Sequence, residues 1–125
     1  MAKRRADSIL CIGNNPVQLN LRCLLLRKNG WTVLSSGNGY EGIRQFAREV
    51  VDAVVVDLNH DGSEAALITG ELKRLRNEVP VILMVSDEKA LAPGTTQQAS
   101  AVILRSQEEL KLVEALKTLL PSSRL

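Results

Sequence analysis

The stretch DAVVVDLNHDG, residues 52–62, decides the fold of this chain. Four apolar residues in a row, three of them valine, lead directly into the carboxylate of Asp57, and a polar, turn-forming cluster follows. β-branched residues favour strands, and an apolar run without alternation is typical of a parallel strand buried on both faces. We therefore predict that Asp57 ends a central parallel strand. Ligands of open α/β sheets bind at this carboxyl end.

The length and composition of the chain predict one globular domain, residues 1–125, with its core at about 8–120. Hydrophobic residues make up 45% of the chain and aromatic residues only 2%, so the core must consist of Leu, Val, Ile and Ala. The formal net charge of +2 is too small to indicate a nucleic-acid partner. No apolar run approaches the roughly 18 residues of a membrane span, so we expect no membrane partner.

The N-terminus and the two cysteines predict a cytoplasmic protein. The basic run Lys3-Arg4-Arg5 lies in a tail, residues 1–7, that we expect to be solvated, and no apolar signal-peptide region follows it directly. Cys11 and Cys23 stand in apolar surroundings without a histidine at metal-binding spacing. They are interpreted as buried free thiols in a reducing compartment.

Outside the opening stretch, strand-like runs alternate with helical patterns, which is typical of βαβ units and a parallel sheet with helices on both faces. Strands are predicted at 8–12, 31–34, 80–85 and 101–104, in addition to the strand that ends at Asp57. Helices are predicted at about 16–29, 63–77 and 107–120, with another after the turn 35–39 and at most short fragments within 87–100. The apolar positions expected to be buried in two of these helices are Ile43, Phe46, Ala47, Val50 and Ala65, Ile68, Leu72, Leu75, whereas Glu108, Glu109, Lys111 and Lys117 of the last helix are expected to face water.

Four of the predicted strands change from apolar to polar at their carboxyl ends, which a parallel sheet places along one rim. The residues concerned are Gly13-Asn14-Asn15, Asp57, Ser86-Asp87 and Arg105-Ser106. Strand ends are commonly polar because loops are exposed to water, and this explains part of the pattern. It explains less well why a buried run leads directly into Asp57.

These residues resemble the receiver domains of response regulators. Asp57 matches the phosphoacceptor that closes the third strand, Leu58-Asn59 resembles the residues that follow it, and Ser86 matches the hydroxyl that closes the fourth strand. Tyr40-Glu41-Gly42-Ile43 resembles the start of the second helix of the family. The resemblance covers about residues 8–120. It implies a flavodoxin-like, doubly wound (βα)5 sandwich of three layers, with five parallel strands in the order 2-1-3-4-5.

The resemblance also implies a function, that of a stand-alone receiver in two-component phosphorelay signalling rather than an enzyme. Asp57 would accept a phosphoryl group from a histidine kinase or phosphotransfer protein and form an acyl phosphate. Mg²⁺ would be held by Asp57, Asn14 and the backbone carbonyl of Asn59. Ser86 and Arg105 would bind the phosphoryl oxygens, and a downstream protein partner would read the resulting surface.

The chain departs from the family pattern at several of these positions. The acidic pair that holds the metal falls on Gly13 and Asn14, so we expect impaired Mg²⁺ binding and expect Gly13→Asp with Asn14→Asp to strengthen it. Arg105 replaces a lysine with a planar fork. The remaining departures are Ser106 in place of proline, Val102 at the aromatic switch position, and Pro93-Gly94 within the fourth helix.

These departures leave a second hypothesis open, a phosphorylation-independent pseudo-receiver that kept the fold as an interaction module. In that case Asp57 is a structural acid, for example in an ion pair with Arg105.

A glycine-rich motif and the single histidine are alternative candidates for a functional site. Residues 37–42, GNGYEG, form a G-x-G-x-x-G motif, and Asp57 follows roughly 20 residues later, as in a dinucleotide-binding fingerprint. The motif follows the second strand rather than the first, so we favour a loop whose glycines allow a positive φ, before a helix with Asn38 or Gly39 near its cap. His60 is the only histidine and makes a poor metal site by itself.

Overall fold

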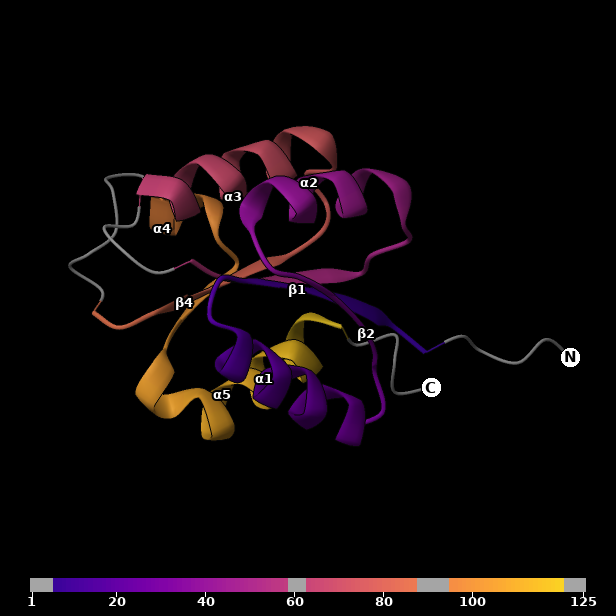
Figure 1. Ribbon diagram of the computed structural model, residues 1–125, viewed down its shortest axis with the longest axis vertical. Helices are drawn as coiled ribbons and strands as arrows, with labels where there is room; N and C mark the ends of the chain where they lie inside the picture. Colours follow the sequence, from indigo (N-terminus) through magenta and orange to yellow (C-terminus); the bar gives the residue numbers. More distant parts are fainter. Residues whose placement is uncertain (1–5, 59–62, 88–94, 121–125) are drawn as a thin grey trace, which may run out of the picture.

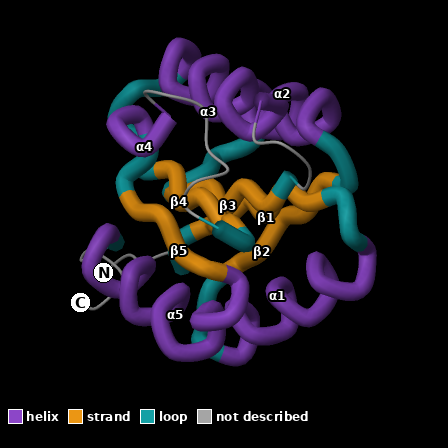
Figure 2. The backbone as a smooth tube through the Cα atoms, turned by 90° about the vertical axis from the view of Figure 1, so that its left-hand side faces the viewer, coloured by secondary structure: helices purple, strands orange, loops and turns teal. Residues whose placement is uncertain are grey.

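Five parallel strands form one sheet in the order β2-β1-β3-β4-β5 (Figure 2). The computed structural model describes residues 6–58, 63–87 and 95–120. The strands are β1 (Ser8–Gly13), β2 (Thr32–Ser36), β3 (Ala53–Asp57), β4 (Val81–Val85) and β5 (Ala101–Leu104). This order is the one that the sequence predicts, and the flavodoxin-like fold is confirmed.

Helices cover both faces of the sheet and make three layers (Figure 1). Two helices lie on one face, α1 (Pro16–Lys28) and α5 (Glu108–Leu119), and a short 3-10 helix, η2 (Arg105–Gln107), precedes α5. The opposite face carries α2 (Gly39–Arg48), α3 (Ser63–Leu75) and α4 (Thr95–Gln98). The first turns of α1 and α5 lie at the same end of the sheet, where the strands end (Figure 1).

The central strands are buried on both faces because their side chains alternate between two hydrophobic cores. Every residue of β3 and β4 is buried. Val55 packs into the core under α1 and α5, whereas Val54 and Val56 pack into the core under α2 and α3. The same core under α1 and α5 contains Cys11 and Cys23, which are buried and free as predicted.

The register of the sheet brings the predicted rim residues together. β1 and β3 pair so that Gly13 lies directly opposite Asp57. β4 and β5 end beside them, with Val85 opposite Leu104. The residues that follow the strands therefore meet at one edge of the sheet.

Two of the predicted apolar stripes are partly wrong. In α2, Ala47 is exposed, and Val50 lies beyond the end of the helix with 64% of its surface exposed. The helix instead buries Gly39, Gly42 and Phe46. In α3, Leu75 is the last residue and is 36% exposed, because the helix ends before another turn can cover it.

The glycine motif at residues 37–42 is explained by packing. A Cβ placed on Gly42 would lie 2.4 Å from Cδ1 of Ile12, and one placed on Gly39 would lie 2.6 Å from Cδ1 of Ile68. Asn38 caps α2, since its Oδ1 accepts a hydrogen bond from the backbone N–H of Glu41 at 2.9 Å. The cap at Asn38 is therefore as predicted, but the predicted positive φ is wrong: among the described glycines only Gly30 has one. The glycines of the motif instead let α2 approach the sheet and α3 closely.

The segment between β4 and β5 is described only in part. Its helix α4 spans four residues, Thr95–Gln98, in agreement with the short fragments predicted there. The predicted interruption at Pro93-Gly94 lies outside the described residues, as do Asn59, His60 and Asp61. Among the described helices, none has the length and apolar character needed to span a membrane.

The close approach of α2 predicts that a side chain at position 42 is not tolerated. We expect Gly42→Val to lower the free energy of unfolding by about 2–3 kcal/mol, because the core around the fully buried Ile12 cannot accept it without displacement. Gly37→Val is the matched control, since no atom lies within 4 Å of a Cβ there, and its effect should stay within about 0.5 kcal/mol. Urea unfolding measures both, and equal losses would contradict the packing role of Gly42.

Candidate functional site

Asp57 lies at the focus of the rim but is closed off by two arginines. It is the last residue of β3, and only 2% of its surface is exposed. Its Oδ1 accepts a hydrogen bond from Nε of Arg105 at 2.7 Å and lies 2.6 Å from Nη2 of the same residue. Its Oδ2 accepts a hydrogen bond from Nη2 of Arg22 at 2.8 Å. Both carboxylate oxygens are therefore held by cations.

Arg22 is a buried arginine on the inner face of α1. Its side chain is 1% exposed. Besides Asp57 it contacts Glu108, with Nε donating to Oε2 at 2.6 Å and Nη2 donating to Oε1 at 3.0 Å. Burial alone would lower the pKa of Arg22, but hydrogen bonds and charges from Glu108 and Asp57 outweigh it and raise the pKa. The guanidinium is thus a fixed positive charge.

Arg22, Asp57, Arg105 and Glu108 form what we call the Asp57 network. It contains two cations and two anions, so its formal charge is zero. The prediction that Glu108 faces water is wrong: its side chain is 19% exposed and turns inward to Arg22. Glu108 is the first residue of α5, where a negative charge is also favoured by the helix dipole.

Arg22 is not among the site residues predicted from the sequence, although the pattern of α1 contains a signal for it. The buried positions Leu19, Arg22, Cys23 and Leu26 follow one helix face at spacings of three and four residues. An arginine among apolar residues at such a spacing is buried and needs an acid near it. The predicted ion pair between Arg105 and Asp57 is present in the structure.

The described residues around Asp57 do not fit Mg²⁺. Gly13 lies opposite Asp57 and offers no side chain, and Arg22 occupies Oδ2 of the carboxylate that would bind the metal. Nη1 of Arg22 has no hydrogen-bond partner among the described residues, and it would lie 3.8 Å from a Cβ on Gly13. A buried N–H donor at this place requires an acceptor and repels a cation.

The other predicted metal ligands add no negative charge to the described site. Asn14 is half-buried at the bend after β1, and Asn59 lies outside the described residues. Within the parts of the chain that the structure describes, no group of three His, Cys, Asp or Glu residues could hold a metal ion. Asn14 and Asn59 as metal ligands stay predictions.

The predicted phosphoryl ligands differ in their surroundings. Arg105, in η2, is committed to Asp57. Ser86 directly follows β4 and is exposed at the same rim. The role of Ser86 and Arg105 in binding a phosphoryl group stays a prediction.

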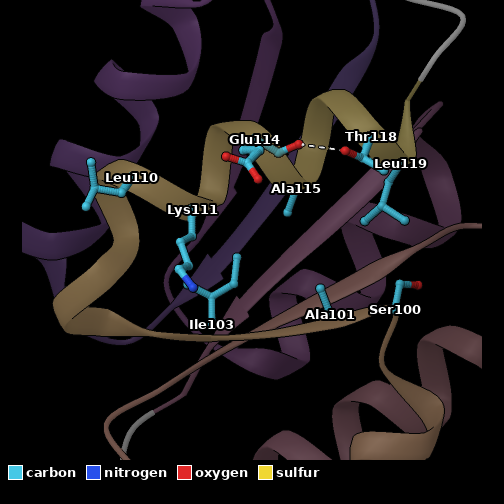
Figure 3. Close-up of a pocket in the computed structure, with 9 residues that line it drawn as sticks. All are labelled: Ser100, Ala101, Ile103, Leu110, Lys111, Glu114, Ala115, Thr118 and Leu119. Carbon is cyan, nitrogen blue, oxygen red and sulfur yellow. Dashed lines mark hydrogen bonds between the residues drawn. The ribbon is translucent and has the colours of Figure 1, made fainter.

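Two hollows lie on the α5 side of the molecule. A groove of about 790 Å³ runs between α1 and the start of α5, and Arg22, Arg105 and Glu108 form part of its lining. A smaller hollow of about 390 Å³ lies between β5 and α5, with Lys111 and Glu114 beside apolar residues such as Ile103 (Figure 3). The smaller hollow contains no member of the Asp57 network and is separate from its chemistry.

Comparison with known proteins agrees with this architecture. No family model matches the chain. The chain is 31% identical over 78 residues to the transcriptional regulatory protein GlrR of Escherichia coli, a match that covers 62% of this chain and 18% of that protein. It is 28% identical over 91 residues to the sensor histidine kinase GacS of Pseudomonas protegens, covering 69% of this chain and 10% of the kinase. The chain thus spans a small part of the length of these relatives.

Solved structures give the same result for the fold. The response regulator TrrA of Thermotoga maritima, in complex with Mg²⁺ and beryllofluoride, matches with a TM-score of 0.82 at 21% identity, over 90% of this chain and 98% of that chain. The receiver domain of a sensor histidine kinase from Pseudomonas aeruginosa, with magnesium in its active-site cleft, matches with a TM-score of 0.80 at 20% identity, over 94% and 99% of the two chains. The chain has the CheY-like receiver fold, and the resemblance to response-regulator receiver domains that the sequence predicts is confirmed.

The burial of the Asp57 network predicts a large cost for removing Arg22. We expect Arg22→Met to lower the free energy of unfolding by about 3–5 kcal/mol, because it leaves two carboxylates, Asp57 and Glu108, with one cation, Arg105, at a largely buried site. Arg44→Met is the matched control, since Arg44 pairs with Glu41 at 3.5 Å on the surface, with both side chains about half exposed. Its cost should not exceed about 0.5 kcal/mol. Similar costs in chemical denaturation would show that the network does not stabilise the fold.

Proposed function

We propose that this domain is a receiver-like interaction module of two-component signalling that acts without phosphorylation of Asp57. The observation that carries the proposal is the closed Asp57 network, in which Arg22 and Arg105 hold both carboxylate oxygens. The geometry favours the pseudo-receiver over the phosphoacceptor as the function of this fold.

Phosphoryl transfer to Asp57 would require a free carboxylate oxygen and a route of approach. Asp57 is 2% exposed, and each of its oxygens faces a guanidinium at 2.6–2.8 Å. To attack a phosphohistidine, the carboxylate would have to break at least one ion pair at a buried site, where unpaired charges are costly. The network has no net charge to attract Mg²⁺, so the metal would not offset that cost.

In this proposal Asp57 has a structural role. It connects α1, β3 and η2, while Glu108 extends the connection to α5. The domain therefore presents one fixed surface to its partners. Since GlrR is a transcriptional regulatory protein and GacS a sensor histidine kinase, we expect the partner to be a histidine kinase, a phosphotransfer protein or a downstream regulator in the cytoplasm.

Phosphorylation of Asp57 is the second candidate. It is favoured by the position of Asp57 at the carboxyl end of β3, with Arg105 in contact and Ser86 exposed at the same rim. In this case Arg22 leaves Asp57, and Ser86 and Arg105 bind the phosphoryl oxygens. Mg²⁺ would then be held by Asp57, Asn14 and the carbonyl of Asn59.

Titration with Mg²⁺ and beryllofluoride separates the two candidates. We expect the amide chemical shifts of the wild-type rim to stay unchanged, and a phosphoryl donor such as acetyl phosphate to add no mass at Asp57. Amide shifts suit this test better than fluorescence of Trp31, which is buried at the opposite end of the sheet, just before β2. Saturable rim shifts that disappear in Asp57→Asn would refute the proposal.

A variant with a rebuilt metal pocket serves as the positive control. Gly13→Asp with Asn14→Asp alone supplies acids, but Arg22 is positioned to pair with an acid at position 13. We therefore expect saturable rim shifts only when Arg22→Ala is added and the triple variant remains folded by circular dichroism. If the folded triple variant also shows no saturable shifts, Arg22 is not the residue that prevents binding of Mg²⁺ and beryllofluoride.

A further inference from the structure

The outer face of α1 carries an apolar stripe that nothing in the described structure covers. Val17, Leu21 and Leu24 are 68%, 61% and 61% exposed, and they are spaced four and three residues apart along one side of the helix. The opposite side of α1 is buried in the core through residues such as Leu19 and Leu26. A helix that is apolar on both sides is typical of one buried between two layers.

The stripe continues into the groove between α1 and α5, which lie side by side (Figure 2). Leu21 lines this groove together with the half-buried Leu25 and with Leu110, which is 78% exposed. We call Val17, Leu21, Leu24, Leu25 and Leu110 the α1–α5 surface. Arg22 and Glu108 join the two helices behind this surface.

The charges at the two ends of the α1–α5 surface are of opposite sign. Lys28 is exposed in the last turn of α1, four residues after Leu24 on the same side of the helix. Glu109 is exposed in the first turn of α5 and lines the groove beside Gln18 and Leu21. The surface therefore has an apolar centre with the exposed cation of Lys28 at one end and the exposed carboxylate of Glu109 at the other.

We propose that a second copy of this chain covers the α1–α5 surface, with the two α1 helices antiparallel about a twofold axis. In such a dimer the two apolar centres meet, and Lys28 of each copy faces the acidic end, with Glu109, of the other. The antiparallel arrangement also brings the negative end of each α1 dipole near the positive end of the other. The charge pattern thus makes the surface complementary to itself.

The size of the surface indicates a weak dimer. Five aliphatic side chains with a few charged neighbours make a smaller patch than the roughly 800 Å² per partner of standard interfaces. We therefore expect reversible association, with monomer and dimer both present at high micromolar concentration. This inference is independent of whether Asp57 is phosphorylated.

Sedimentation velocity of the full chain from about 10 µM to about 1 mM tests the proposal. The average mass of the wild type should rise toward that of a dimer with concentration. Leu21→Glu should weaken association at least tenfold, because it places a charge at the apolar centre. Leu67→Glu is the matched control: Leu67 is 75% exposed on α3, on the other face of the sheet, and its substitution should leave association unchanged.

A charge exchange tests the antiparallel geometry. Lys28→Glu and Glu109→Lys should each weaken association severalfold, and the double variant should restore it, since the opposite charges then meet again across the axis. A chain that stays monomeric at 1 mM overturns the proposal. It is also overturned if Leu21→Glu and Leu67→Glu associate equally well, or if the double variant fails to recover.

Discussion

The contact between Arg22 and Asp57 is the constraint on which the rest of the structure depends. A carboxylate at the end of a central, fully buried strand cannot stay charged without a partner. Arg22 meets this requirement from the inner face of α1, and because a guanidinium has more donors than one carboxylate can use, it also holds Glu108. One side chain thereby fixes the positions of α1, β3 and the start of α5. Arg105 binds the other carboxylate oxygen of Asp57 and brings the formal charge of the Asp57 network to zero.

The response regulator of T. maritima has the same fold and was determined with Mg²⁺, whereas here a guanidinium of the chain itself holds the carboxylate of Asp57. A metal ion is exchangeable, so its arrival and that of a phosphoryl group can change the charge of the site. In this structure a guanidinium attached to α1 neutralises the carboxylate instead. Gly13, at the position expected for an acid, leaves room beside Nη1 of Arg22.

The fold could be predicted from the sequence because it depends on local patterns, whereas the network depends on contacts between distant segments. The apolar run before Asp57 and the alternation of strands and helices predict β3, a parallel sheet and the place of Asp57 at the rim, whereas the order of the strands follows from the resemblance to receiver domains. Arg22 lies 35 residues from Asp57 and 86 from Glu108, so no spacing in the sequence reveals that they meet. Glu108 looks like an ordinary exposed acid in a helical pattern. The prediction for α2 is partly wrong because Gly39 and Gly42, which periodicity does not count as apolar, share its buried side with Phe46.

α1 contributes side chains both to the Asp57 network and to the outer surface of the domain. Its inner face supplies Arg22 to Asp57, and its outer face exposes Val17, Leu21 and Leu24. In a domain that switches, such a helix would shift with the charge of the site and carry the change outward. Here the link from Arg22 to Glu108 holds α1 against α5, and both partners of the link belong to the chain. A pair of helices joined in this way suits the constitutive association that the proposed function, without phosphorylation, would use.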